Sequence, residues 1–229
     1  MFYHPVPPDV TSWNPEDNSD ATLLAGNLPT PNYWQANFQT TLNTFHSVRT
    51  NTSKTSGKWM TMAQINAIDA LGGWALGISN QRAPLLQRAG ATQDSVGAQF
   101  AANAQRLITY GISEIFYSLL SNTRDQIAMC LDADAGLVWW NNFSENSGWT
   151  NANENNFTGN PSTGVGGTRL GFTPSVDTPA YIIGSGYYGN RLTDAIMINP
   201  QCYGFTASIP FLFSSWDPLT ITFTVAEPC

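Results

Sequence analysis

The chain has 229 residues, of which 16 are acidic and 9 are basic, so its formal net charge is −7 at pH 7. The basic residues form no run, and this balance argues against a protein that binds the phosphate backbone of a nucleic acid. Charged residues make up only 11% of the chain, well below the roughly 25% of an average soluble domain. The surface must therefore be polar without being charged, or be buried inside a larger assembly.

The amino-terminal residues predict an extended arm. Residues 1–11 contain prolines at positions 5, 7 and 8, and proline fits neither a helix interior nor a central strand. We expect this arm to lie along a neighbouring subunit, with Phe2 and Tyr3 as assembly contacts. Because the arm has no basic start followed by an apolar core, no secretory signal is expected. No stretch of ~18 apolar residues occurs in the chain, so membrane insertion is not expected either.

From Ser12 onward, residues that favour turns recur at short intervals. This spacing leaves room for strands rather than for long helices. The main turn signals are Asn14-Pro15, Pro31-Asn32, Gly57, Gly72-Gly73, Gly90, Gly136, Gly148, Gly159, Gly166-Gly167, Gly184 and Gly189-Asn190.

Two regions, 62–68 and 94–120, are rich in Ala, Gln and Leu and could be drawn as amphipathic helices. Gly97 and Gly111 would each cost a helix about 1 kcal/mol. The runs Leu107–Tyr110 and Ile115–Tyr117 consist mainly of residues that favour strands. We therefore predict mostly strand in both regions.

The segment from Gln126 to Trp140 predicts a β-hairpin. Two short apolar runs, Ile127–Leu131 and Leu137–Trp140, flank Asp132-Ala-Asp-Ala-Gly136. Asp and Gly adopt turn conformations at little cost, whereas Val and Trp suit a pleated sheet. Further on, Leu219–Val225 alternates apolar residues with Thr, which predicts a strand with one buried face.

Four short motifs follow one another along the chain: Val48-Arg49, Ser56-Gly-Lys-Trp59, Gly73-Trp-Ala-Leu-Gly-Ile-Ser79 and the segment from Asp125 to Trp139. In order and spacing they resemble the motifs of a SPRY domain. In addition, Asn160–Gly167 and Phe211–Trp216 are similar to segments of SPRY-like domains in the virion proteins of tailed phages. Departures from the pattern include Met60-Thr-Met-Ala63 after the Trp and a long loop over 141–156.

The resemblance covers Ser12 to Asp217 and implies an all-β fold, a bent antiparallel β-sandwich of the concanavalin-like jelly-roll kind. We expect an extended arm over 1–11, the sandwich over 12–218, and an added carboxy-terminal strand and tail over 219–229. Members of this family mostly bind other proteins through loops at one side of the sandwich. Those loops vary, so the resemblance transfers no contact residues.

Candidate catalytic groups are few. General acid–base catalysis most often uses histidine, and the chain has only His4, in the arm, and His46, before a predicted strand. Glu145 and Glu154 could form a glycosidase pair only if the fold brought them together. The Gly164–Gly167 segment does not link a strand to a helix, so it predicts no phosphate site. We expect a protein without enzymatic activity.

Neither metal nor cofactor is expected. Asp132 and Asp134 alternate like the first ligands of a calcium loop, but the later ligands of that pattern are missing, and a hairpin turn explains both residues. Cys130 and Cys202 lie in apolar contexts typical of buried thiols. Cys229 ends the chain as a mobile end or as a cross-link to a neighbouring subunit, and we count it with the assembly contacts.

The loop after Trp140 combines aromatic and amide side chains, which suit contacts with proteins or sugars. The alternative is that some of these rings fill the core. The predicted contact residues are Trp140, Asn142, Phe143, Trp149, Asn151 and Phe157. Asn51, Asn142 and Asn156 match the glycosylation pattern, which occurs by chance in a chain rich in Asn and Thr.

Together these features predict a structural protein in the virion of a tailed phage, such as a decoration, collar or fibre-associated subunit. Its partners would be other virion proteins and further copies of itself within an assembly, and it would bind no nucleic acid. The alternative is a carbohydrate-binding module for attachment to a host surface protein or glycan.

Overall fold

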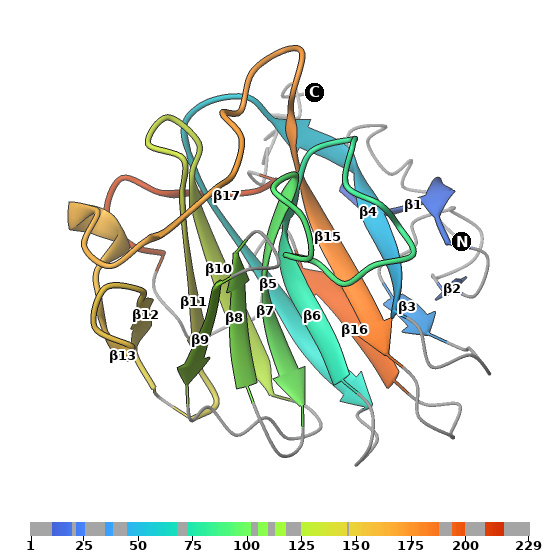
Figure 1. Cartoon of the computed structure of the whole chain (residues 1–229), viewed down its shortest axis with the longest axis horizontal. Helices are drawn as coiled ribbons and strands as arrows, with labels where there is room; N and C mark the ends of the chain where they lie inside the picture. Colours follow the sequence, from blue (N-terminus) through green and yellow to red (C-terminus); the bar gives the residue numbers. More distant parts are fainter. Residues whose placement is uncertain are drawn as a thin grey trace, which may run out of the picture.

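The computed structural model describes residues 11–19, 22–25, 35–38, 45–67, 73–101, 105–109, 113–117, 125–145, 147–187, 194–199 and 209–217. These residues fold into two large antiparallel sheets that lie one behind the other (Figure 1). The described residues contain no α-helix, and one short 3₁₀ turn, η1, spans Pro161–Thr163. The predicted antiparallel β-sandwich is confirmed, whereas the arm before residue 11 and the strand over 219–225 lie outside the described residues.

Sheet A is the front sheet of Figure 1, and each of its neighbouring strands is antiparallel to the next. In spatial order it contains β1 (Trp13–Asn18), β4 (Phe45–Lys54), β15 (Ala180–Tyr187), β6 (Gly73–Ser79), β7 (Ser95–Ala101), β8 (Gln105–Thr109) and β9 (Ser113–Tyr117).

Sheet B lies behind it. Its order is β14 (Thr168–Arg169), β11 (Leu137–Asn142), β10 (Gln126–Asp132), β5 (Lys58–Ala67), β16 (Asp194–Asn199), β3 (Gln35–Phe38) and β2 (Thr22–Ala25). The short strand β17 (Ser214–Ser215) pairs in parallel with the start of β5. A separate ribbon joins β12 (Trp149–Asn151) to β13 (Asn156–Gly159).

The predicted hairpin is confirmed, because β10 and β11 pair in register from Ile127 with Asn142 to Asp132 with Leu137. Gly136 closes its turn with a φ of 65°, a backbone conformation that glycine adopts without steric cost. The strands predicted over 62–68 and 94–120 are also present, as most of β5 and as β7, β8 and β9. The prediction of strand in both regions is therefore confirmed, and in 94–120 the glycines correctly argued against a helix.

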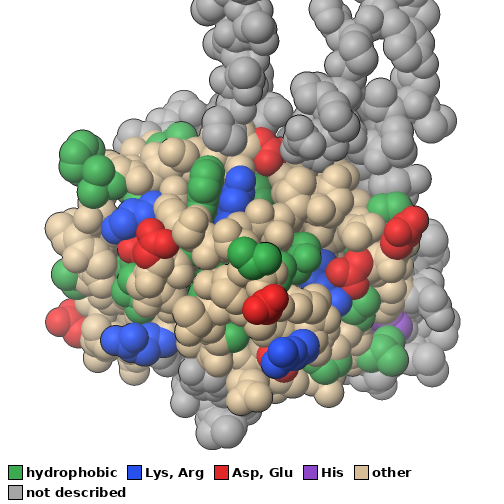
Figure 2. Space-filling model, turned by 90° about the horizontal axis from the view of Figure 1, so that it is seen from above, with side chains coloured by type: hydrophobic (Ala, Val, Ile, Leu, Met, Phe, Trp, Pro, Cys, Tyr) green, Lys and Arg blue, Asp and Glu red, His purple; other side chains and the backbone are tan. Residues whose placement is uncertain are grey.

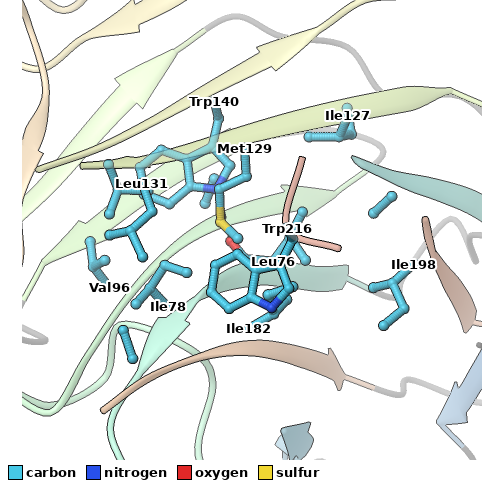
Figure 3. Packing of buried hydrophobic residues seen from close by; sticks show 14 of the residues in the cluster. Leu76, Ile78, Val96, Ile127, Met129, Leu131, Trp140, Ile182, Ile198 and Trp216 are labelled. Atoms are coloured by element: carbon cyan, nitrogen blue, oxygen red, sulfur yellow. Dashed lines mark hydrogen bonds between the residues drawn. The ribbon is translucent and has the colours of Figure 1, made fainter. Parts of the chain in front are cut away.

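The space between the two sheets is filled by apolar side chains from both (Figure 3). Trp140 of β11 lies here without exposed surface, and its Nε1–H donates to the carbonyl oxygen of Leu76 in β6, at 3.0 Å. One indole thus links the two sheets. Other members of this core are Ile78, Val96, Ile127, Met129, Leu131, Ile182, Ile198 and Trp216.

The central strands β10 and β11 of sheet B are buried on both faces. Successive residues of a strand point to opposite sides, so Ile127, Met129 and Leu131 enter the core between the sheets while Ala128 and Cys130 face outward. The outward side chains are covered as well, and Cys130 has no exposed surface. This is why β10 reads as a continuous apolar run instead of an alternating one.

The expected low surface charge is visible on the face shown in Figure 2, where acidic and basic side chains are scattered, some of them side by side, in a surface made mostly of uncharged groups. Two ion pairs occur among the described residues, Arg49 with Asp17 and Lys58 with Asp132. No helix of the described part is long and apolar enough to cross a membrane.

Candidate functional site

A tight turn of apolar residues lies next to the outer face of sheet B. In this turn, residues 210–213, the backbone N–H of Phe213 donates to the carbonyl oxygen of Pro210 at 3.0 Å. Phe211 is 76% exposed and Leu212 is 62% exposed. Since large apolar side chains are costly to leave in water, two adjacent ones on a projecting turn mark a candidate contact site.

Leu212 has a backbone conformation that its side chain disfavours. Its φ is 72°, in the left-handed region where Gly or Asn is usual at the third position of a turn. A residue of this kind held there costs on the order of 1–3 kcal/mol. The turn therefore presents an exposed leucine at the expense of stability.

Phe213 fastens this turn to the sheet. It is 8% exposed and packs in a cluster with Met60, Cys130 and Trp139. Its ring centroid is 6.4 Å from that of Trp139, at an interplanar angle of 87°, and the Nζ of Lys58 lies 5.7 Å from the ring. The same side chain therefore contacts an aromatic ring and a cation on sheet B.

Two further exposed side chains share this side of the molecule. The Nε1–H of Trp139 donates to the carbonyl oxygen of Val165 at 2.8 Å, and Val165 is 49% exposed. Arg169 pairs directly opposite Leu137, so the two side chains lie on the same face of the sheet. The surface next to the turn thus combines apolar groups with an exposed guanidinium.

The structure divides the six predicted contact residues into two groups. Trp140, Asn142 and Asn151 are buried, so their side chains offer no surface to a partner. Asn142 donates from Nδ2 to Asp125 Oδ2 at 2.9 Å, and Asn151 donates from Nδ2 to Thr158 Oγ1 at 3.0 Å. Both amides hold loops in place, and burial also removes Asn142 as a glycosylation acceptor.

Phe143, Trp149 and Phe157 are half-buried. Phe143 and Trp149 meet edge to face, with ring centroids 5.9 Å apart and an interplanar angle of 89°. Phe157 packs against the core between the sheets. A contact role for these three residues stays a prediction, and Phe2, Tyr3 and Cys229 lie outside the described residues.

The carboxylates of the hairpin turn bind groups of the protein itself. Asp132 pairs with Lys58 Nζ at 2.8 Å and accepts from the N–H of Ala135 at 2.9 Å, while Asp134 accepts from the N–H of Gly57 at 3.0 Å. The bonds to Lys58 and Gly57 fasten the turn to the start of β5 and to the loop before it. Among the described residues, no group of three or more His, Cys, Asp or Glu side chains is placed to hold a metal ion.

Two of the other candidate catalytic side chains, His46 and Glu154, form hydrogen bonds within the fold. The Nδ1 of His46 lies 3.0 Å from Ser19 Oγ, and His46 is buried. Glu154 Oε2 accepts from Asn156 Nδ2 and Thr158 Oγ1 within the β12–β13 ribbon. His4 lies outside the described residues.

Lys54 lies in an aromatic setting at the end of β4. Its Nζ is 3.9 Å from the ring centroid of Trp59 and 5.6 Å from that of Trp216. Burial lowers the pKa of Lys54 from its ordinary value of 10.5, and the negative charge of Asp217 offsets part of this effect. Folding therefore shifts the protonation equilibrium of Lys54 toward the neutral amine, relative to the unfolded chain.

Because the pKa of Lys54 is lower in the folded chain, the unfolded chain binds more protons between the folded pKa and 10.5. Stability must then rise with pH in that window. We expect the native protein to gain stability relative to Lys54→Met when urea unfolding is compared at about pH 8 and about pH 10. Parallel pH dependences of the two proteins would contradict this assignment.

The exposed turn was not among the contact residues predicted from the sequence, although Phe211–Trp216 was one of the motifs that carried the resemblance. The sequence signal for this turn is the segment Ile209-Pro-Phe-Leu-Phe213. This segment has a proline inside an apolar run, without the Gly or Asn that turns usually contain.

Three solved structures have a similar fold. The chain is similar to the PSpry domain of TRIM65, with a TM-score of 0.56 and 11% identity over 82% of this chain and 91% of that one. It is also similar to the SPRY domain of human HERC1, with a TM-score of 0.51 and 16% identity over 82% and 96%. The third is a human SPRY domain, with a TM-score of 0.51 and 13% identity over 78% and 94%.

No protein-family model matches the chain, and no curated protein matches it. At identities of 11% to 16%, the likeness to the solved structures shows the fold alone. The fold is SPRY-like, as the order of the sequence motifs implied.

Proposed function

We propose that the chain is a non-enzymatic protein-contact module, which serves as a structural subunit in the virion of a tailed phage. The observation that carries the contact role is the exposed turn at Phe211 and Leu212, whose backbone is held in a disfavoured conformation. A strained residue persists only where the surrounding structure holds it, and such residues cluster at functional sites. The turn is the proposed binding anchor.

The shape and charge of this surface define the partner. Two apolar side chains on a projecting turn fit an apolar pocket of another protein, because binding energy concentrates in a few anchors that become fully desolvated. Arg169 lies on the same side of sheet B, and the structure describes no carboxylate paired with it. A pocket with carboxylates at its rim complements both features.

The virion setting is supported by the sequence. Asn160–Gly167 and Phe211–Trp216 are similar to segments of SPRY-like domains in tailed-phage virion proteins, and the second of these includes most of the exposed turn. The charge content of 11% suits a subunit whose surface is largely covered by neighbours. We propose a decoration, collar or fibre-associated position, with several copies in each particle.

Incorporation into particles tests this proposal. Phe211→Ala is expected to lower the amount of the protein in purified phage particles by about 10-fold or more, since loss of a contact anchor costs about 2 kcal/mol or more. Val176→Ala is the matched control, because Val176 is 87% exposed but lies in the loop between β14 and β15. Equal incorporation of both variants, or absence of the native protein from particles, would overturn the proposal.

A carbohydrate-binding role is the second candidate. It is favoured by the half-buried Trp149 in β12 and by the exposed amide of Asn153 in the turn between β12 and β13. If the protein binds a glycan, a glycan array should show a signal that Trp149→Ala removes and Phe211→Ala leaves intact. Under the leading proposal, no glycan binds in a manner that depends on Trp149.

A further inference from the structure

Exposed apolar side chains lie on both sides of β11 at the outer face of sheet B. The turn with Phe211 and Leu212 lies toward β5, because it leads directly into β17, which pairs with β5. Val165 lies toward the other side, since it comes shortly before β14 and its carbonyl oxygen accepts from Trp139 of β11. The apolar surface of the proposed contact therefore has two parts, one on each side of β11.

Exposed charges are divided in the same way. Arg169 belongs to β14, which ends the described part of sheet B, and pairs directly opposite Leu137 of β11. Asp134 lies in the turn between β10 and β11, where its carboxylate accepts at 3.0 Å from the N–H of Gly57, the residue before β5. Arg169 and Asp134 are both exposed, and neither belongs to an ion pair with another described residue. A positive and a negative group thus flank Leu137.

This arrangement is complementary to itself. A second copy, turned about a two-fold axis parallel to β11, presents its β14 side to the β5 side of the first copy. Arg169 of each copy then faces Asp134 of the other, and Val165 faces the exposed turn. Two-fold dimers form through self-complementary surfaces of this kind. Because the net charge of −7 makes two copies repel each other on average, their association needs such local complementarity.

We propose that the partner of the exposed turn is a second copy of this chain, held across this two-fold axis with Arg169 of each copy paired with Asp134 of the other. This interface rests on the proposed function, which assigns the turn to protein contact, and it names the partner of that contact. Burial of Phe211 and Leu212 supplies most of the affinity, whereas the two ion pairs set the orientation of the copies.

Charge reversal in the full chain tests this interface, with sedimentation equilibrium as the measurement. The native protein is expected to dimerise. Arg169→Glu and Asp134→Arg should each raise the Kd of the dimer about tenfold or more, because a dimer of either variant contains two like-charge contacts. Arg82→Glu is the matched control. Arg82 is also exposed but lies in the loop after β6 of sheet A, so this variant should leave the Kd unchanged.

A mixture of the two charge variants gives the sharpest result. When Arg169→Glu pairs with Asp134→Arg, both contacts between the copies again join opposite charges. The mixture should therefore associate at least tenfold more tightly than either variant does alone. A native protein that sediments as a monomer, or a mixture that associates no better than the separate variants, overturns the proposed interface.

Phe211→Ala separates this interface from the proposed function. It is expected to raise the Kd of the dimer about tenfold or more, and an unchanged Kd would show that the turn does not meet a second copy. If the isolated protein stays monomeric while Phe211→Ala still lowers incorporation into particles, the turn binds a different virion protein. The second copy is then excluded as its partner, and the proposed function is retained.

Discussion

Trp140→Ala is expected to destabilise the domain by about 3–5 kcal/mol. Trp140 is fully buried between the sheets, and its Nε1–H satisfies the carbonyl oxygen of Leu76 on the opposite sheet. Alanine leaves a cavity between the sheets and removes the hydrogen bond to Leu76. Urea denaturation followed by circular dichroism measures the change.

Trp149→Ala is the matched control, because it also removes an indole from the same predicted contact loop. Trp149 is only half-buried, so Trp149→Ala should destabilise the domain clearly less than Trp140→Ala does. The free energy of unfolding of Trp140→Phe should lie between those of the two alanine variants, since this variant keeps a ring and removes the N–H donor. If Trp140→Ala proved no less stable than Trp149→Ala, the assignment of Trp140 to the core would be wrong.

The second large effect is expected at Arg49. Its Nε and Nη2 donate to the two carboxylate oxygens of Asp17 at 2.7 and 2.8 Å, and its Nη1 donates to the carbonyl oxygen of Ala83 at 2.7 Å. Arg49 is 5% exposed. One guanidinium thereby fixes β1 and the loop after β6 to β4.

Arg49→Ala is expected to lower the free energy of unfolding by about 2–3 kcal/mol, because it leaves the partly buried carboxylate of Asp17 and the carbonyl oxygen of Ala83 without their donor. Arg49→Lys keeps the charge but lacks the planar fork that binds two oxygens at once, so it should recover only part of the loss. The same urea titration measures both variants. Full stability of Arg49→Lys would show that charge alone, without the fork geometry, accounts for the role of this residue.

The hairpin around Gly136 could be predicted from the sequence because its causes are local. Asp132 and Gly136 favour a turn, and apolar residues on either side require burial. The strands over 94–120 followed from similar reasoning, since the glycines made a helix costly. These elements needed no knowledge of distant parts of the chain.

Which aromatic and apolar side chains are exposed could not be predicted in the same way. Trp139 and Trp140 are adjacent, so they point to opposite faces of sheet B. Whether either face meets solvent depends on segments far away in the sequence, and Phe213 covers the outer one. Strands that are buried on both faces give no polar side from which exposure can be inferred. The prediction therefore placed the buried Trp140 at a surface and did not identify the exposed side chains of Phe211 and Leu212.

We propose that the turn at Phe211 and Leu212 binds a neighbouring protein in the phage particle. Its most direct test is to place a photo-crosslinking residue at position 211, and in a separate variant at position 176, and to irradiate purified particles. We expect a crosslink from position 211 to one defined virion protein, and none to that protein from position 176. Absence of a crosslink at 211, or the same products from both positions, would contradict it.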